Sequence, residues 1–199
     1  MNPEHLTFRY PWTGLEAYLA SVNASQLGLL AYGSLMSRQS AGLTVSVDSE
    51  GSFVPVIAYG IRRIFNYRMS NTGTVRHGIP TTPRNVAALN VQSTDDLQDL
   101  VNGFLLQISI SDIPSLRERE TGYDLVQVVA KTWDQQMAVP GPVFALESPD
   151  VDETILPHLQ YLQTCERGAL SVSDEFLDCF RRTTFLADGT ALIDWHRDY

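Results

Sequence analysis

Hydrophobic residues recur along the middle of this chain in short runs that are separated by turn-forming residues. Runs rich in β-branched and aromatic residues, bounded by glycine, proline, asparagine or serine, are typical of strands. They predict strands over residues 27–32, 53–59, 61–69, 86–91, 103–110, 123–133 and 143–146. In the second run both alternating sets of side chains are apolar, which suits a strand in a closed or doubly covered sheet. The pattern therefore predicts a small mixed β-barrel in an α+β fold.

Helical spacing of hydrophobic residues appears before and after these strands. Over residues 13–24, Thr13 and Glu16 have the spacing of a capping box, and one face is apolar, with Leu15, Tyr18, Leu19 and Val22. Further helices are expected over residues 111–120, 153–165 and 173–182, of which the first carries an early proline and stops at a glycine. The barrel is thus expected to have flanking helices.

Three segments show no clear period. Residues 37–43 fit either a short helical turn or a loop, and residues 183–199 are irregular. Residues 71–85 contain two glycines, two prolines and four threonines. This composition predicts a long exposed loop or loose hairpin, and such loops often line the rim of a pocket.

The length of 199 residues fits a single domain with a sizeable core. Within it we expect an N-terminal helical arm (1–26), a barrel (27–146) and a linker with a helical C-terminal appendage (147–199). A hydrophobic content of 44% and a charged content of 19% are those of an ordinary globular protein.

The formal net charge of -9, without a basic stripe, disfavours nucleic-acid binding because the chain repels phosphate backbones. No apolar run approaches the length that spans a membrane, and the N-terminus lacks the pattern of a signal peptide. We therefore expect a cytoplasmic protein, a monomer or homodimer, that handles a small molecule.

The first candidate for chemistry is the turn formed by Tyr32, Gly33, Ser34 and Leu35, directly after an apolar strand. Backbone N–H groups left unpaired at such a turn can hold a carboxylate or a developing oxyanion. An ordinary turn, in which glycine supplies an unusual backbone angle, explains the same residues.

The second candidate is the charged run at residues 117–123, which contains Glu118 and Glu120. A solvated helix end with local ion pairs would account for it. Helical residues two positions apart project about 200° from each other, so only one of these carboxylates can face inward.

Four motifs in this order resemble the gamma-glutamyl cyclotransferase family, a small mixed-barrel superfamily that includes the ChaC-type and AIG2-like proteins. The motifs lie at residues 32–35, 58–65, 103–106 and 116–123, and the resemblance covers residues 27–146. Each motif alone is weak, and it is their order and spacing that carry the resemblance.

The resemblance implies the roles of individual residues. The family's general base is a glutamate four positions after a leucine and shortly before an aromatic residue; here it is Glu120, after Leu116 and before Tyr123. Tyr123 is expected to bind substrate together with the turn residues Tyr32, Gly33, Ser34 and Leu35. The family's turn often continues with Asn-Leu, and here Leu35 and Met36 stand instead, as in ChaC-like members, which leaves the substrate open.

The implied reaction closes 5-oxoproline by attack of the substrate's own α-amine on its γ-carbonyl, releasing an amine or amino acid. It needs a base of raised pKa and donors for the oxyanion, and neither a metal nor a cofactor. The alternative is a non-catalytic module on the same fold that binds a small molecule, because fold and function are separable.

Other sites are weaker. Ser34 lacks the surroundings of a nucleophilic serine, and the four histidines, among them His77, have no metal-ligand spacing. The spacing of Cys165 and Cys179 indicates free thiols and not a disulfide or a reactive site. The aspartates within residues 94–99 indicate a solvated turn and not a metal site. Adjacent on a strand, Arg62 and Arg63 point to opposite faces, so that one could steer a carboxylate while surface pairing is the simpler interpretation.

Overall fold

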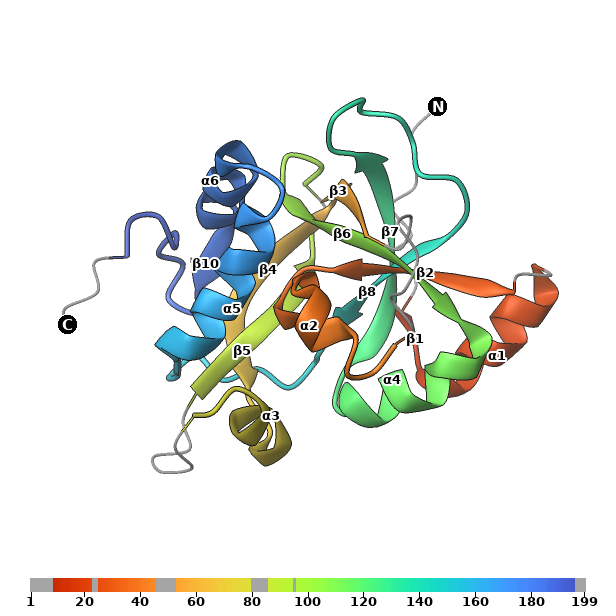
Figure 1. Ribbon diagram of the computed structural model, residues 1–199, viewed down its shortest axis with the longest axis horizontal. Coiled ribbons are helices and arrows are strands. Elements are labelled where there is room, and N and C mark those ends of the chain that lie inside the picture. Colours follow the sequence, from red (N-terminus) through yellow and green to blue (C-terminus); the bar gives the residue numbers. More distant parts are fainter. Residues whose placement is uncertain (1–8, 23–24, 46–52, 80–85, 95, 196–199) are drawn as a thin grey trace.

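A computed structural model describes residues 9–22, 25–45, 53–79, 86–94 and 96–195, and its strands form two sheets that pack against each other (Figure 1). The larger sheet has the order β1-β7-β3-β6-β2-β8, and a further pairing of β7 with β8 closes it. The smaller sheet has the order β10-β4-β5-β9. The predicted barrel is thus confirmed, and a second sheet accompanies it.

The closed barrel consists of five strands: β2 (Gln26–Ala31), β3 (Val54–Tyr59), β6 (Leu100–Ser109), β7 (Asp124–Thr132) and β8 (Val143–Glu147). Most neighbours are antiparallel, whereas β2 and β8 run parallel. The two-residue strand β1 (Arg9–Tyr10) pairs with β7 outside the ring. Since the barrel interior must be filled, side chains on both faces of these strands are largely apolar and buried.

The second sheet contains β4 (Ile61–Arg68), β5 (Val86–Ser93), β9 (Leu156–Pro157) and β10 (Thr184–Leu186). The chain leaves the barrel at Gly60, which lies between β3 and β4 with a φ of 75°. Because a side chain strains such a backbone conformation, glycine suits this corner. β5 then lies against β8, and β4 against β6, so that the two sheets share one core.

Helices surround the sheets. They are α1 (Trp12–Ser21), η1 (Ser34–Met36), α2 (Arg38–Ala41), α3 (Asn71–Arg76), η2 (Ile110–Asp112), α4 (Ile113–Arg119), α5 (Leu159–Leu170) and α6 (Asp174–Arg182). In Figure 1, α1 and α4 lie at the barrel, whereas α5 and α6 lie beside β4, β5 and β10. Helix α6 also reaches the barrel, because the buried ring of Phe176 packs against Phe104 and Trp133.

Helix α1 differs from the expectation at its start. It begins at Trp12, and Pro11 is its N-cap without a side-chain hydrogen bond. Thr13 therefore lies inside the helix, and its interpretation as the capping residue is wrong. Leu15 and Leu19 are buried as predicted, whereas Val22 is exposed and residues 23–24 lie outside the described residues.

The expectation of a loop or hairpin over residues 71–85 is wrong in its first part. Ser70 caps helix α3, since its hydroxyl accepts a hydrogen bond from the Gly73 N–H at 3.1 Å. A good N-cap thus starts a short helix in a sequence whose glycine and threonine content disfavours one. Residues 80–85 lie outside the described residues.

Two C-terminal expectations are also corrected. The helix expected from residue 153 begins only at Leu159, because Leu156 and Pro157 pair with β5 and His158 caps the helix. The segment expected to be irregular contains β10, which pairs in parallel with β4. Earlier in the chain, residues 34–41 form η1 and α2, which resolves the choice between a helical turn and a loop.

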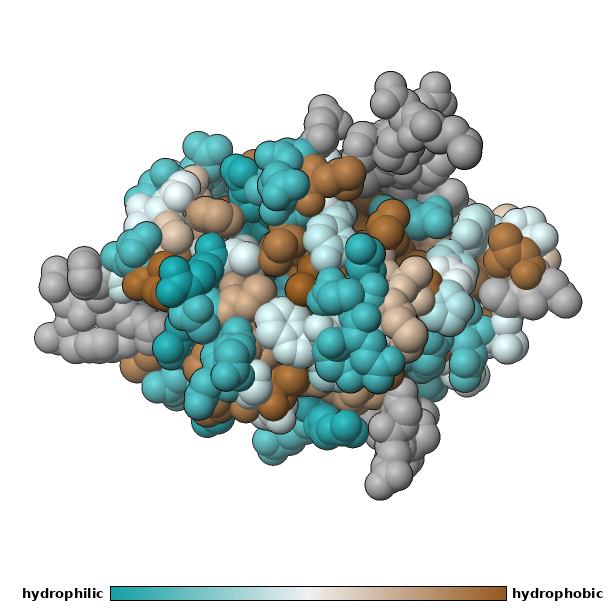
Figure 2. Space-filling view, turned by 90° about the horizontal axis from the view of Figure 1, so that it is seen from above, coloured by the Kyte–Doolittle hydropathy of each residue, from teal (hydrophilic) through white to brown (hydrophobic). Residues whose placement is uncertain are grey.

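On the face shown in Figure 2, hydrophobic residues are scattered among hydrophilic ones. Such scattering is usual for a protein surface. None of the described helices combines the length and the hydropathy that crossing a membrane requires.

Candidate active site

The predicted turn follows β2 directly. Ala31 ends the strand, Gly33 precedes η1, and the Met36 N–H donates to the Gly33 carbonyl at 2.9 Å. The first N–H groups of a helical turn have no partner within it. Within the described residues, those of Gly33, Ser34 and Leu35 donate no hydrogen bond. The turn thus retains the donors that an anion would need.

Tyr32 anchors the start of this turn. Its side chain is buried, and its hydroxyl donates to the carbonyl of Leu146 on β8. Its own carbonyl accepts a hydrogen bond from Arg63 Nη1 at 3.2 Å. Burial raises the pKa of the Tyr32 phenol well above its ordinary value, so the hydroxyl stays neutral. Tyr32 therefore acts on the position of the turn.

Glu120 lies where helix α4 ends. It is the C-cap residue, with φ −100° and ψ 36°, and its N–H still donates to Leu116 at 2.9 Å. Its carboxylate side chain is 16% exposed. Burial raises the pKa of this carboxyl group, while the positive charges of Arg119 and Arg76 oppose the rise.

Arg119 links Glu120 to the turn. Its Nε lies 2.7 Å from Glu120 Oε1, and its Nη2 lies 3.4 Å from Ser34 Oγ. The contact with Glu120 has the distance of an ion pair but not the alignment of a hydrogen bond. Burial lowers the pKa of the Arg119 guanidinium.

A cavity of about 60 Å³ lies between these groups. Its walls come from the turn, from α3, from the end of α4 and from both sheets; the lining residues are Ser34, Tyr67, Met69, Ser70, Gly73, Arg76, His77, Ala88, Arg119, Glu120, Thr121, Tyr123 and Tyr161. Of the predicted site residues, Ser34, Glu120 and Tyr123 line it. Tyr32, Gly33 and Leu35 are buried and are not among the lining residues.

Three tyrosines form an aromatic wall of the cavity. The Tyr123 hydroxyl donates to the Leu89 carbonyl at 2.9 Å, and the Tyr161 hydroxyl accepts from the Leu89 N–H at 3.2 Å. The Tyr67 ring stacks at a tilt on Tyr123, with 4.5 Å between centroids. Burial raises the pKa of all three phenols, so each remains neutral.

Gly122 allows Tyr67 to take this place. A Cβ atom at Gly122 would lie 2.5 Å from Tyr67 Oη, and the φ of Gly122 is 95°. Both the close approach and the backbone angle require glycine after the short helix. The stop that the sequence predicted at this position therefore also shapes the cavity.

His77, which follows α3, packs its ring edge-on against Tyr161 with 5.0 Å between centroids. Burial lowers its pKa to about 4, and the positive charges of Arg119 and Arg76 contribute. The imidazole is therefore neutral near pH 7. Arg76 and Arg119 are then the cations of the cavity and Glu120 its anion.

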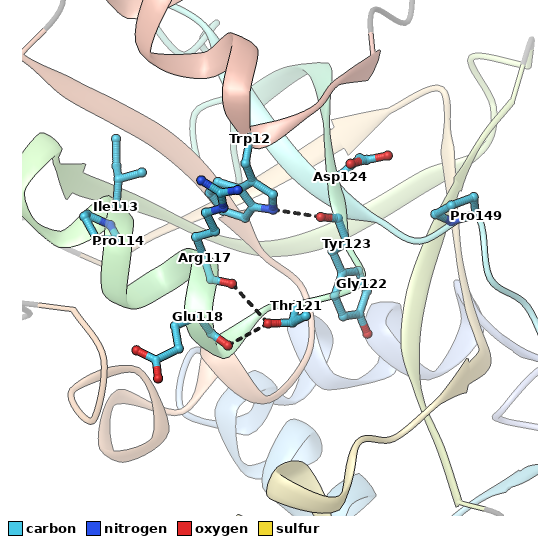
Figure 3. A pocket seen from close by; sticks show the side chains of 10 residues that line it. All are labelled: Trp12, Ile113, Pro114, Arg117, Glu118, Thr121, Gly122, Tyr123, Asp124 and Pro149. Atoms are coloured by element: carbon cyan, nitrogen blue, oxygen red, sulfur yellow. Dashed lines mark hydrogen bonds between the residues drawn. The ribbon is translucent and has the colours of Figure 1, made fainter.

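Glu118 is one of the residues that line a different, larger hollow of about 640 Å³, together with Trp12 and Arg117, and its carboxylate points away from Trp12 and Tyr123 (Figure 3). Tyr123 separates the two hollows: Trp12 Nε1 donates to its carbonyl at 2.8 Å on one side, and its ring lines the small cavity on the other. Size alone would favour the larger hollow. The buried carboxylate of Glu120, its paired arginine and Ser34 of the turn all line the smaller one.

The two adjacent arginines on β4 separate as expected for a strand. Arg62 is exposed and pairs with Asp99 at 2.9 Å, which is the simpler of the two interpretations. Arg63 is fully buried. Neither residue lines the cavity.

Among the described residues no group of three or more His, Cys, Asp or Glu side chains could hold a metal ion. Ser34 Oγ contacts Arg119, and no His–Asp pair adjoins it in the described part of the chain. Cys165 and Cys179 are free thiols.

Sequence reasoning did not single out Arg76, Arg119, Tyr67 or Tyr161 as cavity residues. Arg119 had a local signal, since it directly precedes Glu120 within the charged run. Tyr161 lies on α5, beyond the part of the chain that carries the resemblance. Only the packing of α5 against the turn places its hydroxyl 3.1 Å from the position of a Cβ atom on Gly33.

Comparison with solved structures shows the fold. The chain is 16% identical to a gamma-glutamyl cyclotransferase, with a TM-score of 0.60 and coverage of 87% of this chain and 90% of the other. It is 15% identical to the uncharacterized human protein LOC79017, with a TM-score of 0.61 and coverage of 88% and 91%. It is 18% identical to YkqA from Bacillus subtilis, with a TM-score of 0.61, and covers 57% of that chain with 84% of its own.

No protein-family model matches the chain. No curated protein matches it either. The solved structures nevertheless confirm that the chain has the fold of gamma-glutamyl cyclotransferase, as the resemblance in its sequence implied.

Proposed function

We propose that this protein cyclises a gamma-glutamyl compound, with release of 5-oxoproline and a free amine or amino acid. The observation that carries the proposal is that Glu120 and Ser34 line one cavity and are joined through Arg119. The likeness in fold to a protein named gamma-glutamyl cyclotransferase supports it.

In the proposed reaction Glu120 is the general base. Its carboxylate accepts a proton from the α-ammonium of the substrate, and the freed amine nitrogen bonds to the γ-carbonyl carbon. The ring nitrogen, which now carries two protons, loses one of them to water. The bond from the carbonyl carbon to the leaving nitrogen then breaks as Glu120 returns its proton to that nitrogen, and the released amine takes up a proton from water. Burial, which raises the pKa of Glu120, adapts a carboxylate to proton transfer near neutral pH.

The turn supplies the complementary donors. N–H groups of Gly33, Ser34 and Leu35 stabilise the substrate carboxylate and the oxyanion, while Tyr32 holds the turn and Tyr123 forms the facing wall. Because amine and carbonyl belong to one molecule, binding them in one conformer supplies much of the rate.

Substrate binding requires the cavity to widen. Its volume of about 60 Å³ corresponds to about two water molecules, whereas ligand pockets usually measure about 300–1,000 Å³. The proposal therefore includes displacement of side chains that now fill the site.

The test compares Glu120→Gln with Glu118→Gln, which makes the same change two residues away in the other hollow. Each protein is incubated with gamma-glutamyl amino acids, gamma-glutamyl amines and glutathione, and 5-oxoproline is measured. We expect Glu120→Gln to lower kcat/KM by about 100-fold or more, because the general base is lost. Glu118→Gln should leave the rate unchanged.

Two results would count against the proposal. Undiminished 5-oxoproline formation by Glu120→Gln would exclude Glu120 as the base. No 5-oxoproline from any substrate with the unmodified protein would instead favour the non-catalytic binding module.

A further inference from the structure

Arg119 and Glu120 reach the same cavity although they are consecutive residues. On a regular helix consecutive side chains diverge by about 100°. Arg119 is the last residue of α4, and Glu120 has already left the helical conformation at ψ 36°. This change of backbone direction brings the guanidinium and the carboxylate together, with 2.7 Å between Nε and Oε1.

The guanidinium of Arg119 also ties two segments of the chain together. Nη1 donates to the Ser40 carbonyl at 2.5 Å and to Thr44 Oγ1 at 2.9 Å, and Nη2 donates to Ser40 Oγ at 3.0 Å and to Ser34 Oγ at 3.4 Å. These partners belong to the turn and to α2 with the residues after it. One side chain, only 3% exposed, thus joins the turn to the end of α4.

The other groups around Glu120 cannot replace this contact. Those whose charge or ring faces its carboxylate from the neighbouring elements are Arg76 and His77 of the α3 segment, Tyr67 of β4, Tyr32 after β2, Tyr123 before β7 and Tyr161 of α5. The phenols and the imidazole are neutral near pH 7. Arg76 is cationic, but no ion pair joins it to Glu120 among the described residues.

We propose that Arg119 is a positioning residue for Glu120: its guanidinium, fixed by hydrogen bonds to Ser40 and Thr44, places a positive charge beside the carboxylate, which favours the ionised form and keeps it directed at the cavity beside the Ser34 turn. Its kinetic consequence rests on the proposed function, whereas the placement and ionisation of Glu120 do not depend on any substrate. Arg119 itself takes no proton and forms no bond in the reaction.

Loss of the Arg119 charge should change the pKa of Glu120 in one direction only, upward. An opposite charge a few ångströms away favours the ionised carboxylate, so its removal raises the pKa of Glu120. More of the base is then protonated at neutral pH, and activity is lost at a higher pH as the solution is acidified. Loss of the ion pair also frees the carboxylate to rotate, and small displacements of a catalytic group are costly.

The experiment uses Arg119→Gln, Arg119→Lys and the control Arg117→Gln, which removes the same charge from an exposed position of the same helix. Glutamate carboxyl carbons are labelled with ¹³C, and the Glu120 resonance is identified as the one that Glu120→Gln lacks. Its titration midpoint and the pH profile of kcat/KM are measured for each protein, and circular dichroism checks the fold.

We expect Arg119→Gln to raise the Glu120 midpoint by about one pH unit or more, with an equal shift in the acid limb of kcat/KM. Arg119→Lys should restore most of the midpoint but not kcat, because an ammonium group keeps the charge but cannot make all the hydrogen bonds that fix the guanidinium on Ser40, Thr44 and Ser34. Arg117→Gln should change neither quantity.

An unchanged Glu120 midpoint in a folded Arg119→Gln protein would overturn the inference. So would an equal shift in Arg117→Gln, since the effect would then belong to the overall charge of the helix. The Glu120 midpoint could also shift as expected while even the unmodified protein forms no 5-oxoproline. The positioning role of Arg119 is then supported, and the proposed function fails.

Discussion

Arg63 and Arg119 are both buried arginines, yet their surroundings differ. Every N–H group of Arg63 is directed at a neutral oxygen; the acceptors are Thr184 Oγ1, Thr183 Oγ1, Asn102 Oδ1 and the carbonyls of Tyr32, Asn102 and Phe180. Its guanidinium also lies over the Phe180 ring, 4.0 Å from the centroid. Arg119 contacts a carboxylate and opens onto a cavity.

This difference separates an arginine within the core from an arginine at the candidate site. Arg63 joins β4 to β6, to Tyr32 of the turn and to α6 with β10, and in the described part of the chain no carboxylate forms an ion pair with it. Burial lowers its pKa to about 9, so it remains protonated at neutral pH. Burial of a charge therefore does not by itself indicate an active site; an open cavity and a second ionisable group beside it do.

The largest effect is expected from Arg63→Met. The substitution leaves several buried oxygens without a donor, and each such loss costs about 1–3 kcal/mol. We expect the free energy of unfolding to fall by about 3 kcal/mol or more, measured by urea denaturation followed by tryptophan fluorescence. Arg119→Met should cost less than half as much, because its partners lie beside a cavity that water can reach. Equal losses for the two variants would remove the distinction between them.

A change of intermediate size in the free energy of unfolding is expected when the pH is lowered, because His77 titrates. His77 has a pKa of about 4 in the folded protein, below the ordinary 6.5, so the folded state binds fewer protons than the unfolded state between these values. The free energy of unfolding should therefore fall as the pH is lowered from about 6.5 to about 4.

His77→Gln removes this contribution and should flatten the dependence by about 1–2 kcal/mol, allowing for solvent screening of the partly open ring. The measurement is urea denaturation at several pH values. Arg63 does not titrate in this range, so the Arg63→Met protein should keep the slope of the unmodified protein. If the free energy of unfolding depends on pH equally with and without His77, the lowered pKa of His77 in the cavity is contradicted.

The smallest effect is expected from Arg62→Met, next to Arg63 on β4. Arg62 is exposed, and its ion pair with Asp99 is open to solvent. Such pairs contribute about 0–1 kcal/mol. A loss as large as that of Arg63→Met would show that the strand, and not the buried guanidinium, is sensitive to substitution.

The local pattern of hydrophobic residues predicted the five strands of the barrel, but not β1, β9 or β10. Apolar runs at residues 53–59 and 143–146 lie within one residue of β3 and β8. The pattern sufficed because a closed barrel buries both faces of its strands, and that burial needs apolar residues at consecutive positions. The same pattern did not predict helix α3, because the Ser70 cap and the packing of the helix outweigh the low helix propensity of Gly73 and Thr74.

For the candidate site, the sequence offered the turn at residues 32–35 and the charged run that contains Glu118 and Glu120, and the family resemblance predicted Glu120, because these residues belong to short contiguous motifs. Tertiary structure decided that Ser34 and Glu120 line one cavity, that Glu118 lines another, and that Arg119 joins the turn to Glu120. It also decided that Arg63 is structural. The physical reason is that burial, charge pairing and the pKa of a group depend on side chains distant in sequence, which no local pattern specifies.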